Sequence, residues 1–402
     1  MAVFSGPEIA NDGLVFHYDM GNTVKSWKGA PTTNLITNPN PTTVGGAWGV
    51  TGLSAVTANA AIAPDGTLTA TKLVASTSNT TFQFVSPASA SQPTGTIAYS
   101  CHMKQGEYTT GSLFLTQSGN NGAVFNLTNG TVVSVTGTGN TAAITPHPNG
   151  NGWWRCSVTN TGGTVSAGYR VGPLNGCLAN VGGDGVSGIY VWNCQAEQQS
   201  FATPFVNGTR STTQAVLDLT NNNTVTATSL TYASGGTFSF NGSTNHITTT
   251  NTGITHGTTN FSYSCWAKWS GKPVYGTLFE NGSWTSSFLI RFETNGITIF
   301  SMGAYYGKFS FDPTLNIWYH LAFIRNGNNI ELYVNGVFFS SLAFGTNLNI
   351  VPNTNLIFIG MSQHSAGQCF NGQIANVQIH SRALSAAEIQ QYFEATRGRY
   401  GI

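Results

Sequence analysis

The chain has 402 residues with 15 basic and 14 acidic side chains, so that charged residues make up only 7% of it. Soluble domains ordinarily carry roughly 25%. This scarcity excludes the clustered lysine and arginine patches that bind nucleic acid or acidic lipid surfaces. No apolar run approaches the roughly 20 residues of a membrane-spanning helix, and residues 1–6 lack the pattern of a secretion signal. We therefore expect a protein made in a cytoplasm, with no nucleic-acid partner and no membrane insertion.

The uncharged composition predicts an all-β protein. Aromatic residues are plentiful, with 24 Phe, 14 Tyr and 9 Trp, and the polar residues are mainly Thr, Ser and Asn beside 48 Gly. Threonine and aromatic residues favour strands, whereas asparagine and glycine favour turns. Six cysteines are spread along the chain without a CxxC pair, which predicts buried free thiols, with one or two disulfides as the alternative: Cys101, Cys156, Cys177, Cys194, Cys265 and Cys369.

The first part of the chain divides into an arm, a single strand pattern and a sandwich-like block. We expect residues 1–12 to form an N-terminal arm that docks on a neighbouring domain or subunit, because so short a segment has no core of its own. Residues 13–33 hold one strand pattern. Residues 34–210 alternate short apolar runs with Gly, Asn and Pro, which predicts a jelly roll, with runs at 81–85, 97–101, 112–115, 123–127, 153–158 and 188–192.

Residues 211–402 carry stronger strand patterns and one helix pattern. Asn335-Gly336 between two strand patterns predicts a type I′ hairpin. A capping box of Ser385 and Glu388 predicts a helix that ends near Arg397-Gly398 and covers one end of this block. Strands are predicted at 237–240, 261–269, 288–292, 318–324, 329–334 and 374–379.

The second block resembles the concanavalin A-like, laminin G-like jelly-roll family. Five segments carry the resemblance in order: 318–325, 330–337, 356–360, 370–379 and 382–389. The ending at 392–401 is similar to the version of this family found in virion proteins of tailed bacteriophages. In such phage proteins a strand like 13–22 leads directly into segments like 216–222 and 235–243, so the resemblance implies that the first sandwich is inserted into the second.

The inserted block resembles carbohydrate-binding-module-like jelly rolls of phage virion proteins. The segments 63–73, 152–157, 183–197 and 202–205 carry this resemblance. The predicted fold is therefore all-β, with two jelly-roll sandwiches, the first inserted into the second, and one short C-terminal helix. The domains are residues 13–33 with 211–402 for the concanavalin A-like sandwich and 34–210 for the inserted one.

Catalytic and metal sites find little support in the sequence. Glycoside hydrolysis needs two carboxyl groups roughly 5–10 Å apart. Glu388 and Glu394 share the predicted helix, and only a pair from separate strands, such as Glu280 with Glu293, remains as a candidate. The eight histidines stand at no metal-ligand spacing, and Asp218 and Asp312 are the candidates for calcium. We expect no enzyme activity, no cofactor and no bound metal.

The resemblance implies a non-enzymatic virion protein on the capsid or tail surface of a phage. Its expected partners are other virion proteins, further copies of itself, with three copies implied by the family, and host surface polysaccharide. Sugars stack on aromatic faces, and the candidate contacts, which we expect to be exposed, are Trp48, Trp284, Tyr305 and Tyr306. A receptor-binding tail fibre, a polysaccharide depolymerase and a bacterial laminin G-like surface protein are the alternatives.

Overall fold

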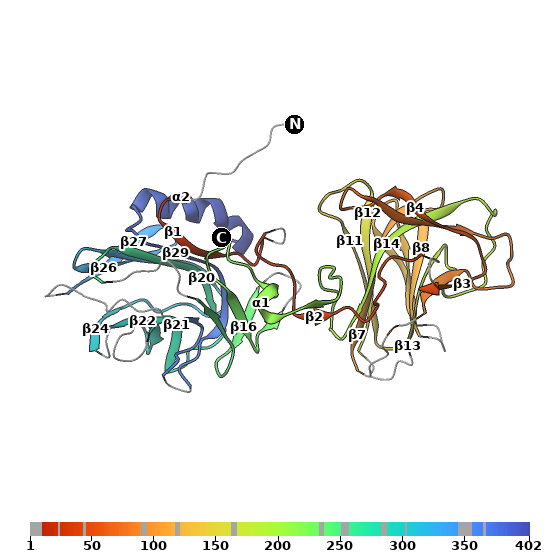
Figure 1. Cartoon of the computed structure of the whole chain (residues 1–402). Coiled ribbons are helices and arrows are strands. Elements are labelled where there is room, and N and C mark those ends of the chain that lie inside the picture. The colour runs from red at the N-terminus through yellow and green to blue at the C-terminus, as the bar shows by residue number, and fades with distance from the viewer. Residues whose placement is uncertain are drawn as a thin grey trace. The chain divides into compact units, whose positions relative to one another are not determined.

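The computed structural model divides the chain into two compact units (Figure 1). It describes residues 10–402 apart from 23–24, 43–45, 89, 91–94, 117–120, 162–166, 233–236, 251–256, 283–287, 302–303, 345–355 and 365–366. The first unit holds Ser211–Ile402 together with the described residues up to Ala30, and the second holds Pro31–Arg210. Most of the expected N-terminal arm, residues 1–9, lies outside the described residues.

The second unit interrupts the first. Strand β1 (Leu14–Tyr18) pairs antiparallel with β29 (Asn371–His380). A strand that precedes the second unit and a strand that follows it therefore lie side by side in one sheet. The outgoing and returning segments pair as β2 (Thr32–Thr33) and β15 (Thr209–Arg210). The all-β fold with one sandwich inserted into the other is therefore confirmed, and in the structure the inserted unit spans Pro31–Arg210.

Two sheets form the first unit. Within the described residues, the larger sheet has β1 beside β29 and the order β17 (Thr231–Tyr232), β18 (Phe238–Asn241), β29, β20 (Phe261–Trp269), β25 (Trp318–Asn326), β26 (Asn329–Val334) and β27 (Val337–Ala343). The smaller sheet has the order β16 (Val225–Thr228), β19 (His246–Thr249), β28 (Ile357–Ile359), β21 (Tyr275–Asn281), β22 (Phe288–Glu293), β23 (Ile297–Ser301) and β24 (Ala304–Phe309). We call them the β1–β29 sheet and the β16–β24 sheet.

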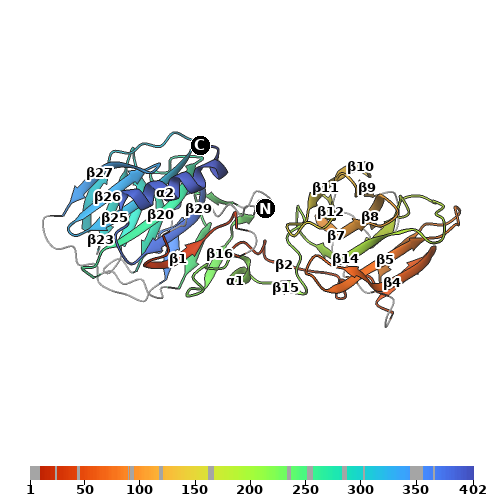
Figure 2. The ribbon, with the colours of Figure 1, turned by 90° about the horizontal axis from the view of Figure 1, so that it is seen from above.

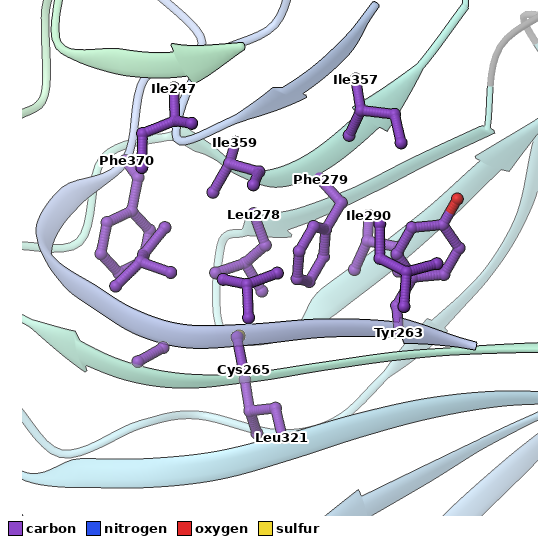
Figure 3. Close-up of a cluster of buried hydrophobic side chains, with 14 of the residues drawn as sticks. Ile247, Tyr263, Cys265, Leu278, Phe279, Ile290, Leu321, Ile357, Ile359 and Phe370 are labelled. Carbon is purple, nitrogen blue, oxygen red and sulfur yellow. The ribbon is translucent and has the colours of Figure 1, made fainter. Parts of the chain in front are cut away.

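The core of the first unit lies between these two sheets. Side chains that alternate inward from each strand interdigitate there, since successive residues of a strand point to opposite faces. Phe279, Ile290 and Ile359 of the β16–β24 sheet meet Tyr263 and Cys265 of the other sheet (Figure 3). All five are at most 1% exposed, so this sandwich has a continuous apolar interior.

The C-terminal helix α2 (Ala386–Thr396) confirms the predicted helix. Ser385 accepts a hydrogen bond from the Glu388 amide, and the Glu388 carboxylate accepts one from the Ser385 amide. A 3-10 turn (Arg397–Tyr400) follows. The expected position at one end of the sandwich is wrong, because α2 lies across the outer face of the β1–β29 sheet (Figure 2). Ile389, Tyr392 and Phe393 fill that interface.

A second, very short helix is not predicted from the sequence. Helix α1 (Thr212–Ala215) is a single turn with a capping box between Ser211 and Gln214. One turn is too short to show the 3.6-residue periodicity on which helix prediction depends.

The predicted hairpin joins β26 and β27. Asn335 and Gly336 have φ values of 51° and 80°, as both central residues of a type I′ turn require. A Cβ atom at Gly336 would lie 3.1 Å from Phe393 of α2. We expect Gly336→Ala to lower the free energy of unfolding by about 1–3 kcal/mol, through strain plus this contact. Urea denaturation measures the change.

Gly327→Ala is the matched control for that prediction. Gly327 also has a positive φ, 59°, but a Cβ atom there would have no described atom within 4 Å. Its substitution therefore adds backbone strain alone, about 1 kcal/mol. An equal effect of the two substitutions would show that α2 does not press on the hairpin.

The second unit is a sandwich of two six-stranded sheets. Within the described residues, one has the order β10 (Thr131–Thr136), β9 (Gly122–Asn126), β8 (Thr110–Thr116), β13 (Ala167–Pro173), β6 (Phe84–Pro87) and β3 (Trp48–Thr51). The other has the order β11 (Asn140–Pro146), β12 (Trp153–Asn160), β7 (Ile97–Gln105), β14 (Gly188–Glu197), β5 (Leu68–Ala75) and β4 (Leu53–Ile62). Tyr99, Cys101, Leu113 and Phe125 are among the buried residues of its core.

Candidate functional site

The outer face of the β16–β24 sheet carries a row of aromatic side chains around one arginine. Ile290 and Phe292 of β22 point into the core, so their neighbour Arg291 points outward. The Arg291 guanidinium lies 4.3 Å from the Tyr275 ring centre and 4.4 Å from that of Phe300. Phe300 in turn contacts Tyr305 of β24 edge to face, at 5.6 Å between ring centres. Four adjacent strands thus contribute one side chain each to a continuous row.

Two members of this row offer their rings to solvent. Tyr305 is 58% exposed and Tyr275 is 36% exposed, whereas Arg291 between them is only 7% exposed. Large aromatic side chains are usually more buried than this, so we take this face as the candidate binding surface. We call Tyr275, Arg291, Phe300 and Tyr305 the aromatic row.

Hydrogen bonds hold the arginine of the row in place. Arg291 donates through Nε and Nη2 to the Glu293 carboxylate, at 3.3 and 3.0 Å, and through Nη1 to Gln368 Oε1 at 2.8 Å. Thr298 also donates to Glu293, at 3.2 Å. The guanidinium is fixed before any ligand arrives, and it fixes the rings that stack on it.

A buried carboxyl group lies further along the same face. Glu280 is fully buried, accepts a hydrogen bond from the Gln363 amide at 2.8 Å, and has His364 Nε2 3.1 Å from its second oxygen. Burial raises the pKa of Glu280 because it disfavours the charged form, while hydrogen bonds from Ser362 and Gln363 oppose the rise. Glu280 thereby holds Gln363, and Arg291 holds Gln368, beside the aromatic row.

Of the four predicted sugar contacts, only Tyr305 lies on this face within the described residues. Tyr306 faces the opposite way, as strand alternation requires, and packs on Phe344 at 5.1 Å between ring centres. Trp48 is 3% exposed in the core of the second unit, where its indole N–H donates to the Asn38 carbonyl. The expectation that Trp48 is an exposed residue is therefore wrong. Trp284 lies outside the described residues.

The candidate catalytic pair, Glu280 and Glu293, lies on one face of the sheet at two separate positions along the strands. Glu280 stands opposite Leu289, four residues before Glu293 on β22. At roughly 3.4 Å per residue, the backbone positions of Glu280 and Glu293 are therefore about 14 Å apart along the strand direction. Retaining and inverting hydrolases need their carboxyl groups roughly 5–10 Å apart. Glu293 is moreover paired with Arg291.

The two calcium candidates already have other partners. The Asp218 carboxylate accepts hydrogen bonds from the His17, Thr220 and Asn223 amides and from the Thr220 and Asn223 side chains. Asp312 pairs with Lys272 at 2.5 Å, and both are partly exposed. No group of three or more His, Cys, Asp or Glu side chains that could hold a metal ion occurs in the described part of the chain. None of its helices is long and apolar enough to cross a membrane.

Tyr275, Arg291, Phe300 and Glu293 were not predicted as members of one surface. Their strands pair as neighbours, with Tyr275 opposite Glu293 and Phe300 opposite both Leu289 and Tyr305. Strand alternation plus hairpin pairing over residues 275–309 would have placed them on a common face, because that stretch is a simple meander.

Comparison with known proteins gives a family match within the first unit. Residues 240–390 match the family model of the concanavalin A-like lectin/glucanases superfamily. A search of curated proteins found no match. Among solved structures the chain is similar to the receptor binding domain of botulinum neurotoxin D, with 17% identity and a TM-score of 0.39 over 46% of this chain and 50% of that chain.

A second structural likeness is the binding domain of Paraclostridial Mosquitocidal Protein 1. It has 18% identity and a TM-score of 0.36, and the alignment covers 44% of this chain and 49% of that chain. Such alignments span about half the length of the matched chains. The family match at residues 240–390, together with the two stacked sheets, supports a concanavalin A-like, laminin G-like jelly-roll fold for this part of the chain.

Proposed function

We propose that this protein is a non-enzymatic component of a tailed-phage virion, displayed on the capsid or tail surface, and that its aromatic row binds host surface glycans. The observation that carries the binding proposal is the exposure of Tyr305 and Tyr275 on either side of a fixed arginine. The virion proposal is supported by the resemblance of residues 13–22, 216–222 and 392–401 to phage proteins. The family also suggests assembly into three copies.

The chemistry of the row suits a sugar. A pyranose presents C–H groups on one face, which stack on Tyr305 or Tyr275, and hydroxyl groups at its rim. The partly exposed Glu293 carboxylate and the Gln368 amide lie beside the rings and supply an acceptor and a donor. Because Glu293 and Gln368 are already hydrogen-bonded to Arg291, these two groups need little ordering on binding.

The same geometry favours binding over hydrolysis. Glu280 is fully buried and the Glu293 carboxylate is paired with Arg291, whereas glycoside hydrolysis needs two carboxyl groups that both reach the glycosidic bond. A purified protein that released reducing sugar from host polysaccharide, and lost this activity in Glu280→Gln or Glu293→Gln, would overturn the non-enzymatic assignment.

We expect Tyr305→Ala to weaken glycan binding about tenfold, the equivalent of roughly 1.4 kcal/mol of lost stacking. The measurement is a glycan array to find a ligand, followed by titration calorimetry on wild type and variant. Phe338→Ala is the matched control, because Phe338 is 53% exposed on β27 of the other sheet. Equal affinities of the Tyr305 variant and wild type would exclude the aromatic row as the binding surface.

The location on the virion needs a separate test. We expect immunogold labelling of purified particles with an antibody against this chain to mark the capsid or the tail. Particles that carry no label, from cells that express the chain, would contradict the virion proposal and leave the glycan measurement unaffected.

A further inference from the structure

Two cysteines meet in the core of the second unit. Cys101 Sγ on β7 and Cys194 Sγ on β14 are 3.0 Å apart, and both residues are at most 1% exposed. This separation is longer than the 2.05 Å of a disulfide and short for two thiols in ordinary contact. Among the described hydrogen bonds, this is the one that joins two sulfur atoms.

A bulge in β14 brings the two side chains together. The register of β14 against β7 shifts between Trp192, opposite His102, and Gln195, opposite Ser100, so Cys101 faces the extra residue. Asn193 takes a φ of 48° in this bulge. Neighbouring antiparallel strands hold opposite Cα atoms about 4.5–5.5 Å apart, inside the range of about 4.4–6.8 Å that a disulfide spans.

The chain entering the second unit fixes this bulge. The Cys194 amide donates to the Pro39 carbonyl at 2.8 Å, the Asn34 side chain donates to the Cys194 carbonyl at 3.1 Å, and the Asn193 amide donates to Asn40. The Tyr99 hydroxyl lies 3.6 Å from Cys194 Sγ. The backbone of Cys194 is thus held on both sides, which fixes the position of its Cβ atom beside β7.

The other four cysteines have different surroundings. Cys156 stands opposite Cys101 in the register of β12 and β7, yet no contact joins the two sulfurs among the described hydrogen bonds. Cys177 lies against Ser112. Cys265 and Cys369 belong to the first unit. The geometry therefore selects Cys101 with Cys194 among the pairs that six cysteines allow.

We propose that Cys101 and Cys194 form a disulfide when the protein meets an oxidising medium, with a small disulfide such as oxidised glutathione as the oxidant. One thiolate attacks the glutathione disulfide, forming a mixed disulfide and releasing one glutathione thiol. The second cysteine loses its proton and displaces the other glutathione, which leaves the protein disulfide and two reduced glutathione molecules. This pairing is independent of the glycan-binding proposal.

Burial determines when the bond can form. It raises the pKa of the Cys194 thiol well above its ordinary value, and the thiolate is the reactive species. In the folded protein, thiol–disulfide exchange at Cys194 is therefore slow, because it requires opening of the second unit. We expect the bond to form during folding in an oxidising buffer, and only slowly after folding is complete.

The test is refolding of the full chain in a mixture of reduced and oxidised glutathione. Free thiols are then alkylated, and peptide mapping locates any disulfide. We expect one bond, between Cys101 and Cys194, with an intact mass about 2 Da lower before alkylation. The thermal midpoint of the second unit should rise by roughly 10 °C, because the bond closes a loop of about 90 residues.

Two cysteine variants separate this pairing from its rivals. Cys156→Ser should still form the bond, whereas Cys194→Ser should form none. A bond mapped to Cys156, or six alkylated cysteines after oxidative refolding, would overturn the proposal. Should refolding fail, expression in a host with an oxidising cytoplasm followed by the same mapping decides between these outcomes.

Discussion

Glu197→Ala should lower the free energy of unfolding of the second unit by about 3–5 kcal/mol, the usual effect of deleting one member of a buried charged network. Glu197 is fully buried near the end of β14. Its carboxylate accepts hydrogen bonds from the Thr203 amide and hydroxyl and from the Gln195 side chain, each at 2.7 Å. Alanine would leave all three donors without this acceptor.

The loss would extend to two arginines, the buried Arg210 and the partly buried Arg155. Arg155 donates to the Thr203 carbonyl at 2.5 Å, and Arg210 donates to the Thr203 hydroxyl at 3.3 Å. Burial lowers the pKa of both guanidinium groups, and the charge of Glu197 opposes that shift. Without Glu197 both cations would lose this compensating charge. We therefore expect residues 203–210, which lead back to the first unit, to separate first from the rest of the second unit.

Glu107→Ala is the matched control for this prediction. Glu107 also belongs to the second unit and pairs with Lys72 at 2.9 Å, but its side chain is half exposed. Exposed ion pairs contribute about 0–1 kcal/mol, since water screens them. Urea denaturation of both variants measures the contrast. Equal losses would mean that the Glu197 network carries no more of the stability than a surface ion pair.

The sequence predicts those parts of the fold that local chemistry determines. Asn335-Gly336 specifies its turn because both residues tolerate a positive φ. Ser385 and Glu388 specify the start of α2 because their side chains satisfy amides that a helix leaves free. The insertion, by contrast, follows from the order of family segments, and the pairing of β1 with β29 is too distant in sequence for periodicity to reveal.

The candidate site shows where such inference stops. Alternation separates Tyr305 from Tyr306 but does not say which of the two faces the core, and the structure turns Tyr306 inward. The same ambiguity explains the wrong expectation for Trp48, the first residue of β3, whose ring is buried. Which face is buried depends on how two sheets stack, and that information is not present in any single strand.

Acidification should destabilise the first unit because His320 is buried in a neutral state. Neither of its ring nitrogens has a hydrogen-bond partner among the described residues, and Trp266, Tyr392 and Phe393 surround the ring, with ring centres 5.4–6.3 Å away. Burial lowers its pKa to about 3, against 6.5 in an unfolded chain. The unfolded state therefore binds the proton first, and stability falls as pH drops below about 6.5.

The neighbouring groups leave this histidine effect unopposed. Burial also lowers the pKa of His17 and His380, which face the same side of the β1–β29 sheet, so they add losses of the same sign. Glu388 lies on α2, and its hydrogen bond from Arg382 lowers its pKa to about 2. Protonation of this carboxylate therefore reduces the stability of the folded state only below about pH 4.5. Arg399 and Asp19 form an ion pair with each other. Between pH 6.5 and 4.5 the histidines dominate.

We therefore expect His320→Phe to flatten the pH dependence of the first unit, removing about 2–3 kcal/mol of the loss between pH 7 and pH 4.5. Hydrogen exchange of the α2 and β29 amides measures the stability of the first unit independently of the second unit. His102→Phe is the matched control, because burial lowers the pKa of His102 in the second unit, and its substitution should leave those amides unchanged. An unaltered pH slope in His320→Phe would show that α2 is not held over a neutral histidine.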